Sequence, residues 1–176
     1  MSFFASSTFT LIHVALSFIG IVAGLVALFG MFRNNPLSSW TLIFVVTTAA
    51  TTLTGFLFPF RGFTPAIGTG IVSSFVLALT ILARYAFHRL GPWRWIYVIT
   101  AVVSLYLNCF VLVVQAFLKV PALHALAPQG TEPAFVLTQG LVLVLLVIAG
   151  FVAVRRFQLS RTPESGSAKP ARSTPA

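Results

Sequence analysis

Four polar side chains that could bind a ligand stand inside otherwise apolar stretches of this sequence: His13, Asn108, Gln115 and Gln139. An imidazole can ligate haem iron or form a hydrogen bond, and a carboxamide can both donate and accept hydrogen bonds. Such groups are costly to bury in an apolar environment unless they are paired. We therefore expect each of them to face another helix or a bound molecule.

Carboxylates, which most catalytic and proton-carrying sites require, are almost missing. The chain has no aspartate, and its only acidic residues, Glu132 and Glu164, lie outside the apolar stretches. Paired-carboxylate acid–base chemistry and Ser-His-Asp hydrolysis therefore lack their parts. The single cysteine, Cys109, allows no intramolecular disulfide and no CxxC motif. We predict no catalytic residue, no metal site and no cofactor, which favours a non-enzymatic protein.

Five apolar runs must position these polar residues. They cover about 9–32, 40–60, 66–87, 95–118 and 134–154. Each is close to the ~20 residues that an α-helix needs to cross a bilayer. Charged residues make up only 7% of the chain, whereas soluble domains have roughly a quarter. The sequence predicts an all-α polytopic membrane bundle of five transmembrane helices, with residues 1–157 as one helical domain and 158–176 as a disordered basic cytoplasmic tail.

Lysine and arginine residues gather on one side of this predicted bundle. The first connection, the third connection and the segment after the last run hold Arg33, Arg84, Arg89, Arg94, Arg155, Arg156, Arg161, Lys169 and Arg172, and the other side holds only Arg61 and Lys119. Cytoplasmic loops carry the excess of Lys and Arg. We therefore predict a multi-pass protein of a bacterial cytoplasmic (inner) membrane, with the N-terminus outside and the C-terminus in the cytoplasm. The residues behind the net charge of +9 lie at these membrane boundaries and in the tail, where Lys and Arg set topology, so we expect no nucleic-acid partner.

Polar residues from four of the predicted helices share one depth near the outer side. At ~1.5 Å of rise per residue, His13, Thr54, Gln115 and Gln139 lie one to two turns from the outer ends of their runs. Asn108 shares a helical stripe with Gln115, and the loop or boundary residues Arg61, Lys119 and His124 could cap the layer.

This outer polar layer has three interpretations. It is either a hydrogen-bonded layer that only packs helices, or a periplasmic pocket for a small molecule, lipid headgroup or quinone. The third is a haem site ligated by His13 and His124. The function predicted from it is that of an accessory subunit or a small-ligand or lipid binder. A b-type haem or quinone-linked redox protein and a transporter component acting as an oligomer are the alternatives. The lipid bilayer is the expected partner, together with a membrane protein or a second copy of the chain.

The connection before the last run has a pattern of its own. Residues 120–128 run between prolines and predict a short interfacial helix, after which Thr131 is expected to be the N-cap of the last helix. Glu132 and Pro133 would then fall in the first turn of that helix, where a negative charge is favourable.

One stretch resembles a known group of proteins. Tyr106-Leu107-Asn108 through Lys119-Val120-Pro121-Ala122-Leu123-His124-Ala125-Leu126-Ala127-Pro128, followed by Glu132-Pro133, is similar to a stretch of a family of uncharacterised bacterial inner-membrane proteins. The resemblance extends over most of residues 10–157. It implies a location in a bacterial inner membrane and no particular activity.

Overall fold

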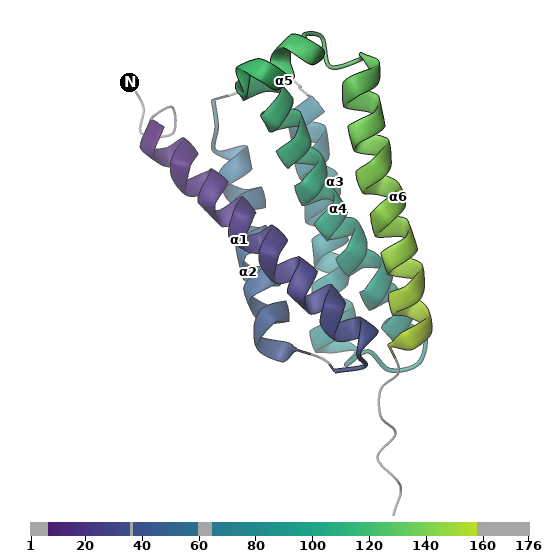
Figure 1. Ribbon diagram of the computed structural model, residues 1–176. Helices are drawn as coiled ribbons and strands as arrows, with labels where there is room; N and C mark the ends of the chain where they lie inside the picture. Colours follow the sequence, from purple (N-terminus) through teal and green to yellow (C-terminus); the bar gives the residue numbers. More distant parts are fainter. Residues whose placement is uncertain (1–6, 36, 60–64, 158–176) are drawn as a thin grey trace, which may run out of the picture.

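A computed structural model describes residues 7–35, 37–59 and 65–157 of the chain, and within these ranges the regular structure is entirely helical (Figure 1). The elements are α1 (Ser7–Phe32), α2 (Ser38–Phe56), α3 (Pro65–Ile81), the π-helical turn η2 (Leu82–Ala86), α4 (Trp93–Lys119), α5 (Pro121–Leu126) and α6 (Pro133–Arg156). The predicted all-α class is confirmed.

Five of these helices are long and apolar enough to cross a membrane: α1, α2, α3 with its η2 extension, α4 and α6. They correspond to the five apolar runs, so the prediction of five helices of spanning length is confirmed. The second is shorter than expected, because the chain leaves α2 after Phe56 through a turn in which the Leu57 N–H bonds to the Thr54 carbonyl. The predicted short helix between prolines is also present as α5.

The helix ends alternate between two ends of the bundle (Figure 1). We call the end that carries Arg33, Arg84, Arg89, Arg94, Arg155 and Arg156 the basic end; it is the lower one in Figure 1. The opposite end, with Lys119 and α5, is the far end. Helix α4 is central, since it contacts α1, α3, α5 and α6, whereas α1 packs mainly along α2. Figure 1 shows that α1 is inclined, so that it lies beside α4 near the basic end and leaves it toward the far end.

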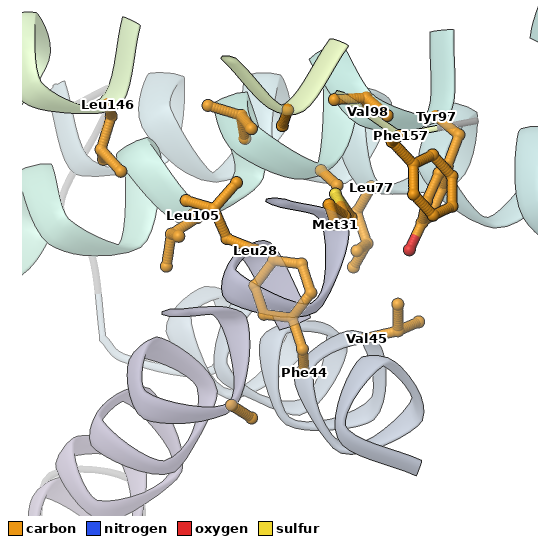
Figure 2. Close-up of a cluster of buried hydrophobic side chains, with 14 of the residues drawn as sticks. Leu28, Met31, Phe44, Val45, Leu77, Tyr97, Val98, Leu105, Leu146 and Phe157 are labelled. Carbon is orange, nitrogen blue, oxygen red and sulfur yellow. The ribbon is translucent and has the colours of Figure 1, made fainter. Parts of the chain in front are cut away.

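The apolar core lies in the half of the bundle nearer the basic end. Leu28, Met31, Phe44, Tyr97 and Leu105 are central members of one buried cluster from α1, α2 and α4 (Figure 2). Leu77 of α3, Leu146 of α6 and Phe157, directly after α6, complete it from the other sides. A cavity of ≈ 10 Å³ remains between α1, α2 and α4, which is about the space that one water molecule needs.

Two glycines bring α1 close to its neighbours. A Cβ atom on Gly24 would lie 2.8 Å from Leu105 Cδ1 and 2.9 Å from Phe44 Cδ2. One turn nearer the far end, a Cβ on Gly20 would lie 3.1 Å from Thr47 Oγ1 and 3.7 Å from Asn108 Nδ2. The Gly-x-x-x-Gly spacing therefore serves contacts within this chain, since small residues let membrane helices approach closely.

Candidate functional site

His13 and Thr54 form a direct contact between α1 and α2. Their Nδ1 and Oγ1 atoms are 2.8 Å apart, and Thr54 Oγ1 is also 2.7 Å from the carbonyl oxygen of Ala50. A hydroxyl has only one proton, and that proton is donated to Ala50. We infer that His13 Nδ1–H donates to Thr54 Oγ1, which leaves Nε2 of His13 as an acceptor. The ring also meets Phe58 edge-on, with 5.2 Å between the ring centroids.

The contacts of Asn108 show which residues of α1, α2 and α4 lie at the same level along the bundle. Its Nδ2 donates to Thr48 Oγ1 at 3.0 Å, beside Gly20. Seven residues are about two helical turns. A step of two turns toward the far end therefore goes from Gly20 to His13 on α1, from Thr48 to Gly55 on α2, and from Asn108 to Gln115 on α4.

Gln115 thus lies at the level of the His13–Thr54 pair and on the same face of α4 as Asn108. It is half-buried, yet within the described part of the chain it makes no hydrogen bond. Lys119, exposed at the last residue of α4, is close enough to His13 for its charge to act on the imidazole. We call His13, Thr54, Gln115 and Lys119 the far-end polar group. From depth along the helices, the sequence predicted that His13, Thr54 and Gln115 share one level.

The other predicted site residues lie elsewhere. Gln139 of α6 is buried, and its Nε2 donates to the Phe110 carbonyl at 3.1 Å while its Oε1 has no partner among the described residues. Phe110 is five residues, roughly 7.5 Å, deeper than Gln115, so Gln139 is not part of the far-end polar group. His124 is exposed on α5. Arg61 lies outside the described residues.

The loop before α6 differs from its prediction. The N-cap residue of α6 is Glu132, not Thr131, and no side chain caps the helix. The Glu132 carboxylate instead accepts the backbone N–H groups of Gln129 and Thr131, both at 2.9 Å. These bonds, above all the one from the Gln129 N–H, hold the pKa of the Glu132 carboxyl below its ordinary value. Glu132 therefore stabilises the turn that leads into α6.

The sequence indicated only a topological role for Arg84 and Arg89 and did not connect them with Tyr97. In the structure, both arginines lie at the ring of Tyr97, which is buried at the basic end. The available signal was a tyrosine inside a predicted span near two arginines that have no acidic residue nearby in the sequence.

Among the described residues, no three or more His, Cys, Asp or Glu side chains are grouped so that they could hold a metal ion. No protein-family model matches the chain, and no curated protein or solved structure gives a significant match. The resemblance of the stretch 106–128 to bacterial inner-membrane proteins therefore remains a prediction, and the function has to be inferred from the geometry.

Proposed function

We propose that this chain is a non-enzymatic integral protein of a bacterial cytoplasmic membrane that binds a lipid-like amphiphile. The head group would sit within the far-end polar group, on the outer side of the membrane, and the apolar tail would lie along the far half of α4. The excess of Lys and Arg at the basic end supports a cytoplasmic location for that end.

The packing of α4 is the observation that carries this proposal. In the half nearer the basic end, every residue from Tyr97 to Leu105 except Ile99 and Val103 is buried. In the next eleven residues, Tyr106 to Ala116, each residue is partly exposed and none is fully exposed or buried. A helix packed tightly on one side and facing lipid on the other would alternate between the two classes. The far half of α4 is therefore packed less tightly than the half nearer the basic end, in line with the divergence of α1 from α4 (Figure 1).

The far-end polar group offers suitable partners for a head group. Gln115 has a free carboxamide that can donate and accept, His13 Nε2 can accept, and Lys119 can donate with a positive charge. These groups project from α1 and α4, the two helices that diverge. A head group with hydroxyl or ester oxygens could pair with all three of these groups.

The haem and transporter alternatives gain no support from a specific contact. His124, the second ligand that a haem held by two histidines would need, is exposed on the separate short helix α5. Among the described residues, no series of acidic or histidine side chains connects the two ends of the bundle as a proton pathway would require.

Exchanging glutamine for leucine at two positions separates binding from packing. We expect Gln115→Leu to melt close to wild type, because it removes no hydrogen bond, but to lose the stabilisation that monoolein gives to the wild-type protein in detergent. Monoolein has an apolar tail, hydroxyl and ester groups and no phosphate, so its head group can bind this site by hydrogen bonding but not by charge. Thermal unfolding with and without monoolein is the measurement.

Gln139→Leu is the matched control. It removes the interhelical bond to Phe110, and such bonds are worth ~0.6 kcal/mol, so its own melting temperature should fall slightly while the response to monoolein is kept. An equal monoolein response in wild type and Gln115→Leu, or none in wild type, would contradict the proposal.

A further inference from the structure

Two arginines meet at one buried tyrosine at the basic end, opposite the far-end polar group. Arg84 is only 8% exposed, and its Nη1 donates to the hydroxyl oxygen of Tyr97 at 3.2 Å. The guanidinium carbons of Arg84 and Arg89 lie 5.7 Å and 5.9 Å from the centre of the Tyr97 ring. Tyr97 itself is 1% exposed and lies beside Phe157 (Figure 2).

Two of the three guanidinium nitrogens of Arg89 have no hydrogen-bond acceptor among the described residues. Its Nε and Nη1 atoms are shielded from solvent, and neither has a partner within the described ranges. An unsatisfied shielded donor calls for an acceptor. Burial and the positive charge of Arg84 also hold the pKa of Arg89 below its ordinary value.

No carboxylate of the described structure can supply that acceptor. The only acidic residue in the described ranges is Glu132, which precedes α6 at the far end. The two arginines therefore form a cationic site with no counter-ion from the helices around it.

The backbone holds Arg89 in place. The π-helical turn η2 ends at Ala86, and the Arg89 N–H then bonds back to the Ala83 carbonyl at 2.9 Å. His88 and Arg89 both have left-handed φ angles, 49° and 60°. Such conformations are costly for residues other than glycine and persist where the surroundings fix them, often at functional sites. π-Helical turns are also frequent at functional sites.

We propose that Arg84 and Arg89 bind a phosphate-type oxyanion at the basic end, either the phosphate of an anionic phospholipid headgroup or free phosphate. The planar guanidinium matches two oxygens of a phosphate at once. Basic pockets between helices on the cytoplasmic side suit anionic lipid headgroups. This site is separate from the proposed amphiphile site, so either can fail without the other.

Melting of the full-length, delipidated protein in a neutral detergent tests the site. We titrate dihexanoyl-phosphatidylglycerol in one arm and inorganic phosphate in the other. Charge-assisted hydrogen bonds are worth ~1.5–3 kcal/mol, so Arg89→Gln should weaken the apparent affinity roughly tenfold to a hundredfold. Arg94→Gln is the matched control, because it removes one charge from the same end and its guanidinium lies over Trp95 instead; its affinity should stay within about twofold of wild type.

Without anion, Arg89→Gln should melt no lower than wild type, because it removes a charge and two shielded donors that have no acceptor among the described residues. If that variant does not fold, Arg89→Lys keeps the charge but loses the bidentate fork and should still bind more weakly than wild type. A response to phosphatidylglycerol alone assigns the site to a lipid headgroup, and an equal response to inorganic phosphate assigns it to free phosphate.

Three results would overturn the proposal. The first is the absence of any stabilisation of the wild-type protein by either probe. The second is an equal loss of affinity in Arg89→Gln and Arg94→Gln, which would indicate general charge attraction. The third is a response that appears only in Glu164→Gln, since the Glu164 carboxylate would then be the counter-ion of the two arginines.

Discussion

Gly24→Leu should strongly destabilise the protein. A Cβ at this position already lies 2.8 Å from Leu105 and 2.9 Å from Phe44, so a leucine side chain would force α1 away from α2 and α4. Overpacking of a well-packed core costs typically ~1–3 kcal/mol and at times more, and at Gly24 three helices meet. We expect the upper part of that range, seen as a melting temperature several degrees lower and a smaller yield of folded protein.

Gly140→Leu is the control for this prediction. Gly140 is a helical glycine of α6, and a Cβ built there has nothing within 4 Å. The added side chain should point into free space, and the melting temperature should stay near that of wild type. Equal losses in the two variants would show that the cost comes from replacing a helical glycine, not from the close approach of α1.

Phe157→Ala should produce the second large loss. Phe157 directly follows α6, is 1% exposed, and packs against Tyr97 with 6.1 Å between the ring centroids (Figure 2). Removing a buried phenylalanine costs ~3–5 kcal/mol in soluble cores. We expect about the lower end of that range for Phe157, because it lies at the end of the bundle where neighbours can close in. Thermal unfolding in detergent measures the loss.

Phe151→Ala, on the same helix, provides the comparison. Phe151 is 57% exposed on the apolar outer surface, so its truncation leaves no internal cavity and should change stability by less than ~0.5 kcal/mol. If Phe151→Ala were as damaging as Phe157→Ala, the placement of Phe157 in the core at the basic end would be wrong.

The five apolar helices could be predicted because lipid imposes a simple length requirement. Runs of about twenty apolar residues have few other solutions in a membrane, and the structure has a helix at each. Local hydrogen bonds set the ends less predictably. The early end of α2 depends on the turn at Leu57, and the cap of α6 depends on Glu132 accepting two N–H groups from its own loop.

The site could be predicted only in part, because rise per residue gives depth but neither helix tilt nor rotation. Depth alone placed His13, Thr54 and Gln115 at one level. It also placed Gln139 there, whereas in the structure Gln139 bonds to the Phe110 carbonyl, deeper in the bundle. Depth alone therefore could not distinguish Gln115, which lies at the level of the His13–Thr54 pair, from Gln139, which does not.

The basic end illustrates a second limit. Arginines near a membrane boundary ordinarily extend toward water, and the sequence indicated only a topological role for Arg84. The π-helical turn η2 changes the angle between successive side chains, so the face that Arg84 presents could not be derived from a regular helical period. Only the fold shows that it reaches Tyr97.

Native mass spectrometry of the full chain, extracted in a mild detergent, tests the proposed amphiphile site most directly. If the far-end polar group holds an amphiphile, the wild-type protein should retain one small molecule per chain after the detergent is stripped. Gln115→Leu should lose that molecule, and Gln139→Leu should keep it. Wild-type protein that carries no bound molecule, or a bound molecule retained equally by Gln115→Leu, would contradict the proposed function.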